Sequence, residues 1–108
     1  MLRLKRVLEY TDFNFAARLS LADLAKIAGL SPMHFASQFR AATGCRPHEY
    51  LLSLRVDRTK ALIAGGNIPL VEVALSVGFQ TQKHFLTVLK RFTGETPARW
   101  RRGVEDQL

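Results

Sequence analysis

Apolar residues recur along most of this chain at the three- and four-residue spacing that is typical of α-helices. The first such stretch covers residues 4–11, and residues 12–18 are predicted to form a connector. A second helix is predicted to begin at Ser20, because Ser20 and Asp23 match a capping box. Its apolar stripe consists of Leu21, Leu24, Ala25 and Ala28. Gly29 is expected to end this helix by supplying the positive φ angle of a sharp turn.

Five further helices are predicted downstream. One begins at Ser31-Pro32 and ends at Gly44, a long helix covers residues 47–64, and two more begin near Pro69 and Thr81. A short last helix is expected after Pro97. The residues predicted to face inward are Phe35, Phe39 and Ala42, then Tyr50, Leu51, Leu54, Ala61 and Leu62, then Leu70, Val73, Ala74 and Val77, then Phe85, Leu89 and Phe92, and finally Trp100. Because no strand-like alternation competes with this pattern, the fold class is predicted to be all-α.

The pattern occurs twice. Residues 21–50 and 70–100 align with one inserted residue, and a repeat with a period of about fifty residues indicates two copies of one supersecondary unit. Each copy has a small residue within its first helix, a glycine four residues later and a phenylalanine in its second helix. These pairs are Ala25 and Ala74, Gly29 and Gly78, and Phe35 and Phe85. A close helix crossing, a sharp turn and an inward anchor are what a helix-turn-helix requires. A plain duplicated helical bundle is the alternative.

The positive net charge of the chain favours a polyanionic partner. Sixteen Lys and Arg against nine Asp and Glu give a net charge of +7, which suits nucleic acid first and an anionic membrane surface second. The single cysteine, Cys45, cannot form an internal disulfide, so a reducing cytoplasm is the expected location. No apolar run approaches the ~20 residues of a membrane span, and no membrane partner is expected.

The chain, from about Leu4 to Arg102, resembles the DNA-binding domain of the AraC/XylS family of bacterial transcription regulators. The resemblance covers most of the chain, and its most specific part is the run from Ile68 to Phe79, followed by His84-Phe85 and by residues 90–97. It implies about seven helices in a homeodomain-like arrangement of two helix-turn-helix subdomains joined by a linker helix. The implied divisions are residues 1–46, 47–64 and 65–108. It also implies a role at promoters, as activator or repressor, with double-stranded DNA and RNA polymerase as partners. No cofactor and no small-molecule ligand are expected in this segment.

The recognition helices are predicted over residues 32–42 and 81–92. Matching to the family places the base contacts at Met33, Ala36, Ser37, Gln82, Lys83 and Thr87. Phosphate contacts are expected from Ser31, Arg40, Thr81, Lys90 and Arg91, which lie at helix N-termini or carry positive charge. Gln can pair with the adenine edge and Lys with guanine, so the second copy is better equipped for base readout than the first. Arg55 and Arg58 are as well explained by intramolecular pairing as by DNA contact.

Catalytic and metal sites are not favoured. His34 and His84 occupy equivalent positions, which indicates a structural role, and no cysteine or carboxylate pattern accompanies them as a ligand set. Ser31, His34 and Cys45 lack an orienting acid and an oxyanion hole. The protein is therefore predicted not to be an enzyme. Two alternatives remain: the DNA-binding fragment of a larger enzyme, such as a DNA-repair methyltransferase, and a basic protein-interaction or membrane-surface module.

Overall fold

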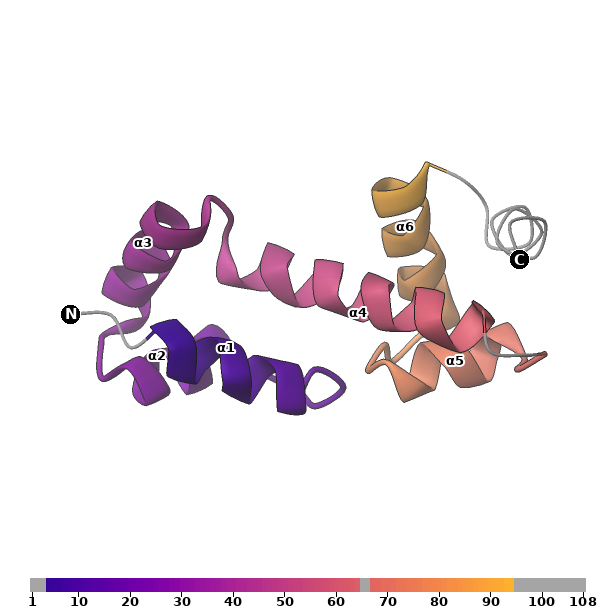
Figure 1. Ribbon diagram of the computed structural model, residues 1–108, viewed down its shortest axis with the longest axis horizontal. Coiled ribbons are helices and arrows are strands. Elements are labelled where there is room, and N and C mark those ends of the chain that lie inside the picture. Colours follow the sequence, from indigo (N-terminus) through magenta and orange to yellow (C-terminus); the bar gives the residue numbers. More distant parts are fainter. Residues whose placement is uncertain (1–3, 65–66, 95–108) are drawn as a thin grey trace. The chain divides into compact units, whose positions relative to one another are not determined.

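The computed structural model describes residues 4–64 and 67–94, and the regular secondary structure of these residues is entirely helical (Figure 1). The prediction of an all-α fold is therefore confirmed. The helices are α1 (Leu4–Phe13), α2 (Leu21–Ala28), α3 (Pro32–Thr43), α4 (Pro47–Ala64), α5 (Leu70–Ser76) and α6 (Gln82–Thr93). The short helix expected after Pro97, with Trp100, lies outside the described residues. α1 extends two residues into the stretch that was predicted to be a connector.

The chain divides into two compact units, Met1–Leu52 and Ser53–Leu108. The first unit contains α1, α2, α3 and the start of α4, and the second contains the rest of α4 with α5 and α6. Each unit therefore holds one helix-turn-helix, α2–α3 in the first and α5–α6 in the second.

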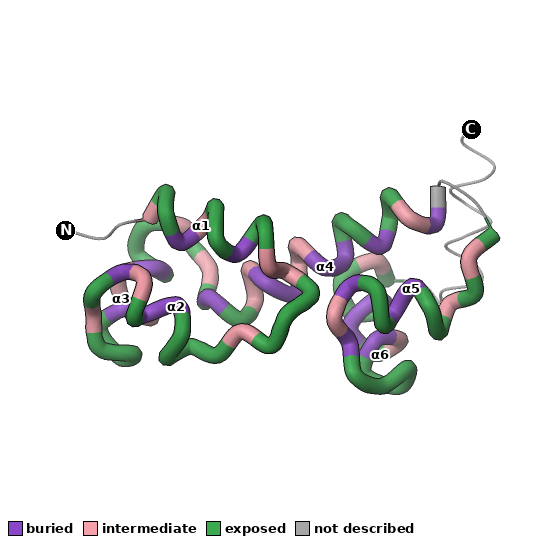
Figure 2. Tube along the Cα trace, turned by 90° about the horizontal axis from the view of Figure 1, so that it is seen from below, coloured by how far each residue is buried: buried purple, intermediate pink, exposed green. Residues whose placement is uncertain are grey.

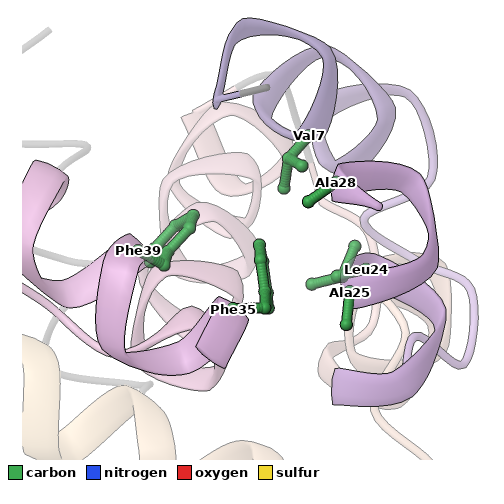
Figure 3. Packing of buried hydrophobic residues seen from close by; sticks show 6 residues of the cluster. All are labelled: Val7, Leu24, Ala25, Ala28, Phe35 and Phe39. Atoms are coloured by element: carbon green, nitrogen blue, oxygen red, sulfur yellow. The ribbon is translucent and has the colours of Figure 1, made fainter. Parts of the chain in front are cut away.

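The core of the first unit is built around Phe35. Helix α2 packs against both α1 and α3. Side chains from these three helices converge on the Phe35 ring, which is fully buried (Figure 3). The Phe39 ring lies 5.6 Å from it, centroid to centroid, and Ala25 is also buried on α2. The small Ala25 side chain lets α3 approach α2 closely, as the sequence predicted.

The core of the second unit repeats this arrangement around Phe85. Helices α5 and α6 pack against each other, with Ala74 buried on α5 and Phe85 on α6. The Phe79 ring, at the end of the turn between them, lies 5.5 Å from the Phe85 ring. The prediction that Phe85 is the inward anchor of this helix is confirmed.

Both turns depend on a glycine with a positive φ angle, 73° at Gly29 and 98° at Gly78. A Cβ atom added at Gly29 would meet no other atom within 4 Å. Glycine is therefore required there for its backbone conformation and not for space. In each copy the residue after the glycine, Leu30 or Phe79, donates its backbone N–H to the carbonyl of the alanine at the helix crossing.

Besides Ala61 on α4, three residues that were predicted to face inward are exposed. Leu21 is 41% exposed, Phe92 is 38% exposed and Ala42 is also exposed. All three lie in the first or last turn of their helices. Helical spacing therefore did not predict the exposure of these end turns.

The buried face of α4 also differs from the prediction. Leu51 is buried as expected, whereas Ala61 is exposed and Leu54 and Leu62 are only partly buried. The buried positions among the described residues of α4 lie in two rows with four-residue spacing. They alternate with exposed and partly buried positions along the helix (Figure 2). They are Pro47, Leu51, Leu52, Arg55, Val56, Thr59 and Ile63. A row of residues four apart drifts around a helix that has about 3.6 residues per turn. The predicted set of residues therefore matches the buried face of α4 only in part.

The start of α2 is held by the predicted capping box. The Ser20 hydroxyl accepts the Asp23 backbone N–H at 3.1 Å, and the Asp23 carboxylate accepts the Ser20 N–H at 3.0 Å. Ser20→Ala is expected to destabilise the protein by about 1 kcal/mol in urea unfolding, because an early N–H loses its partner. Ser76→Ala, at the exposed last residue of α5, is the matched control and should change stability by less than about 0.5 kcal/mol.

This cap also gives the stability of the first unit a defined pH dependence. The hydrogen bonds from the backbone and side chain of Ser20 lower the pKa of Asp23 below its ordinary value. Its contribution is therefore present above the ordinary pKa and is lost as the pH falls through the lower, folded-state pKa. In urea unfolding at a series of pH values, wild type should lose this contribution to stability in acid, while Asp23→Asn should lack it at every pH.

Candidate nucleic-acid interface

The two predicted recognition helices, α3 and α6, begin in the same way. The Ser31 hydroxyl accepts the backbone N–H of His34 at 3.3 Å, and the Thr81 hydroxyl accepts that of His84 at 3.1 Å. Each hydroxyl keeps its own proton for donation to another acceptor. An N-capping serine or threonine at an exposed helix start therefore offers a donor where the helix dipole favours an anion.

Helix α3 presents the predicted contact residues on one exposed face. Met33 is 87% exposed, Ser37 and Arg40 are exposed, and Ala36 is partly buried. Met33, Ser37 and Arg40 follow the spacing i, i+4, i+7 and so share a face. This face is opposite to the one that buries Phe35 in the core of the first unit.

Helix α6 presents the equivalent face with more polar side chains. All five predicted contact residues on this helix are exposed: Gln82, Lys83, Thr87, Lys90 and Arg91. The Thr87 hydroxyl donates to the Lys83 carbonyl at 2.9 Å. Because its proton is engaged within the helix, Thr87 offers its methyl group and an acceptor lone pair to a ligand.

Charge on these two helices has one sign. Neither α3 nor α6 contains an aspartate or glutamate, and their cationic residues lie towards the exposed side. The Arg91 guanidinium lies over the ring of Phe92, with its central carbon 5.3 Å from the ring centroid. Stacking leaves the in-plane N–H groups of an arginine able to reach a phosphate.

The two equivalent histidines are held differently. The His34 ring contacts the Gln38 side-chain amide within α3, with 2.7 Å between the Nε2 atoms. The His84 ring meets the Phe79 ring across the turn, edge to face, with 5.3 Å between centroids. The contact of His84 therefore crosses the turn, whereas the contact of His34 stays within its own helix.

Arg55 is a structural residue that sequence reasoning left open. It is only 8% exposed, and its guanidinium carbon lies 5.5 Å from the centroid of the Phe79 ring. Burial lowers the pKa of the Arg55 guanidinium below its ordinary value. Because Phe79 also contacts Phe85, Arg55 supports the turn that positions α6. No local pattern indicates this, since Arg55 and Phe79 are distant in sequence.

Other chemistry is sparse in the part of the chain that the structure describes. Within residues 4–64 and 67–94 no group of three or more His, Cys, Asp or Glu side chains could hold a metal ion. Cys45 is half-buried, and its Sγ atom lies 3.6 Å from the Thr43 hydroxyl. None of the six described helices is both long enough and apolar enough to cross a membrane.

Comparison with known proteins gives consistent matches. A family model for a helix-turn-helix domain matches residues 24–103. The bifunctional transcriptional activator/DNA repair enzyme AdaA of Bacillus subtilis is 36% identical over 95 residues, covering 88% of this chain and 45% of AdaA. The chain spans less than half the length of the curated relatives that it matches first.

Solved structures share this fold, and two of them illustrate it. One is a transcriptional regulator of Chromobacterium violaceum, described as having an AraC-type DNA-binding domain. It is 26% identical, with a TM-score of 0.84 over 94% of this chain and 90% of that chain. The other is the DNA-binding domain of AdpA in complex with a target DNA. It is 24% identical, with a TM-score of 0.90 over 99% of this chain and 96% of that chain.

Proposed function

This chain belongs to the AraC-type helix-turn-helix family, and we propose that it binds duplex DNA sequence-specifically as the DNA-binding module of a transcription regulator. The main support for this proposal is that the predicted recognition helix occurs twice, as α3 and as α6. Both α3 and α6 follow a glycine turn, bury a phenylalanine and expose a face without acidic residues. An exposed helix of this kind fits the major groove, where base edges can be read.

In this proposal α6 makes most of the base contacts, and α3 contributes mainly phosphate contacts. On α6, Gln82 and Lys83 would read base edges, and the free methyl group of Thr87 would contact a thymine methyl. On α3, Met33, Ala36 and Ser37 offer little hydrogen bonding. The first unit would therefore contribute mainly phosphate contacts, from Arg40 and the N-terminus at Ser31, with Thr81, Lys90 and Arg91 acting similarly on α6.

Lys83→Ala is expected to weaken binding to a selected site by roughly 1–3 kcal/mol and to relax the preference at one or two base pairs. Ser37 lies on the equivalent exposed face of α3, and Ser37→Ala should reduce affinity and base preference much less. The measurement is selection from a random duplex library, followed by affinity determination for wild type and both variants. A larger loss of specificity for Ser37→Ala would contradict the dominance of α6.

One chain is proposed to read two adjacent major-groove segments, with residues 1–46 and 65–108 as the reading subdomains and residues 47–64 as the linker. Because the two reading faces differ in chemistry, the site should be non-palindromic. Footprinting together with measured stoichiometry tests this: one chain should protect the whole site. A palindromic site that requires two chains would overturn it.

Promoter activation with RNA polymerase as a partner is part of the same proposal, because several relatives are named as activators or regulators. The name of AdaA supports one alternative, in which this module is the DNA-binding part of a larger DNA-repair enzyme. A methyl-transfer assay on alkylated DNA, made with the full-length product of the native gene, separates the two possibilities, because methyl transfer by that protein would favour the repair enzyme. The chain of 108 residues should bind DNA and transfer no methyl group, since its only cysteine, Cys45, has no accompanying cysteine cluster.

A further inference from the structure

Met33 is a large apolar side chain that the fold of the first unit leaves in water. It is the second residue of α3, and it is 87% exposed. The neighbouring His34 side chain contacts Gln38 within the same helix, with 2.7 Å between the Nε2 atoms. In a helix-turn-helix the N-terminal residues of the recognition helix reach the base edges of DNA. The Met33 thioether therefore occupies a position from which bases can be read.

Met33 cannot read a base by donating a hydrogen bond. Its side chain has no N–H or O–H group, and its sulfur is only a weak acceptor. The residue in register with it in the second copy is Lys83, since each directly precedes the histidine and phenylalanine that the two copies share. A lysine can donate to guanine O6 and N7. Against a guanine, Met33 would instead remove water from these two acceptors and replace no hydrogen bond, which is unfavourable.

Apolar contact is the interaction that Met33 can make with a base. Thymine presents its C5 methyl group in the major groove, and an apolar side chain distinguishes thymine by contact with that methyl group. Methionine suits such a contact because its unbranched, polarisable side chain adapts to irregular apolar surfaces. Ala36 and Ser37, three and four residues later on the same face, are small, so neither side chain holds the helix away from the base edge.

We propose that Met33 reads the C5 methyl group of one pyrimidine in the part of the site that the first unit contacts. This contact rests on the proposed function, and it adds a base contact to a helix that otherwise supplies mainly phosphate contacts. A methyl group at C5 projects into the major groove in the same way from thymine and from 5-methylcytosine. Binding of DNA is therefore sensitive to methylation of cytosine at this one position, and the methylated base is bound more tightly.

The contact is tested by removing only the methyl group from the DNA. Each thymine of a selected site is replaced in turn by deoxyuridine, and affinities are measured by fluorescence anisotropy. Loss of one buried methyl group should weaken wild-type binding about fourfold at one thymine in the first-unit half, which is the half whose base preferences Lys83→Ala leaves unchanged. DNA with 5-methylcytosine at the same position should bind about fourfold more tightly than DNA with cytosine there.

Variants of the protein assign this ratio of affinities to Met33. Met33→Ala should bind DNA with thymine and DNA with deoxyuridine at that position equally, while Met33→Leu should keep a ratio close to that of wild type. Met33→Lys, which copies α6, should lose the ratio and favour guanine there. Leu75→Ala truncates a 61% exposed leucine on α5 and is the control, so its ratio should equal that of wild type. Because Met33 is exposed, its substitutions should leave the melting temperature nearly unchanged.

A ratio that persists in Met33→Ala would overturn the proposal and, if Thr87→Ser removes it, would place the methyl contact on α6. The proposal would also be wrong if no deoxyuridine substitution in the first-unit half weakened binding and 5-methylcytosine bound no more tightly than cytosine. Neither result affects the proposed function, because DNA would still be bound sequence-specifically. Absence of specific binding to any duplex at low salt would overturn the proposed function itself, and the methyl contact with it.

Discussion

Phe35→Ala and Phe85→Ala are each expected to lower the free energy of unfolding by about 3–5 kcal/mol. Both rings are buried, with exposures of 0% and 1%, and each contacts a second ring, Phe39 for Phe35 and Phe79 for Phe85. Truncation would remove these contacts and leave a cavity in a small core. A loss of this size is a large share of the stability of a domain of this length.

Urea unfolding of the two variants measures this effect, and Phe13→Ala is the matched control. Phe13 lies at the end of α1 and is 89% exposed, so its truncation should change stability by less than about 0.5 kcal/mol. Hydrogen exchange shows which helices are destabilised. Phe35→Ala should reduce the protection of backbone amides mainly in α2 and α3, and Phe85→Ala mainly in α5 and α6. A variant that unfolds like wild type would show that the anchor of that helix is wrongly assigned.

The affinity for duplex DNA is expected to fall by roughly 10³–10⁵ between 50 and 200 mM salt, as for a protein that neutralises about six to ten phosphates. The protein has a net charge of +7, and the exposed faces of α3 and α6 carry no aspartate or glutamate. Affinity should depend on salt because each contact of a cationic side chain with a phosphate releases condensed counterions. An affinity that barely changes over this range would contradict a polyanionic partner.

Two variants locate the charges responsible. Arg40→Ala should weaken binding to all sequences about equally and reduce the slope of log affinity against log salt by about one. Lys60→Ala is the control, because Lys60 lies on α4 beside Asp57, with 4.0 Å between Nζ and Oδ1. Its removal should leave the slope nearly unchanged. Equal slopes for Arg40→Ala and wild type would remove Arg40 from the phosphate contacts.

Helix limits and turns could be predicted because they depend on near neighbours. The Ser20–Asp23 capping box joins residues three apart, and the positive φ angles at Gly29 and Gly78 are properties of single residues. The inward positions of Phe35 and Phe85 followed from helical spacing once the repeat had been aligned. With those anchors placed, the exposed faces of α3 and α6 followed from the period of the helix. The proposed contacts of those faces with DNA stay predictions.

Positions whose environment depends on distant segments could not be predicted. Leu21 and Phe92 have the spacing of core residues, yet they are 41% and 38% exposed. The burial of Arg55 depends on the ring of Phe79, which reaches it only in the folded second unit.

The sequence by itself therefore determined most helix limits, the duplicated turn and the residues on the exposed faces of α3 and α6. These properties arise from interactions over about four residues and from the conformational freedom of single residues. Only the tertiary structure decided the winding buried face of α4 and the support of Phe79 by Arg55. Each of these is formed by side chains from separate helices, and burial depends on which surfaces meet, which spacing along one helix does not specify.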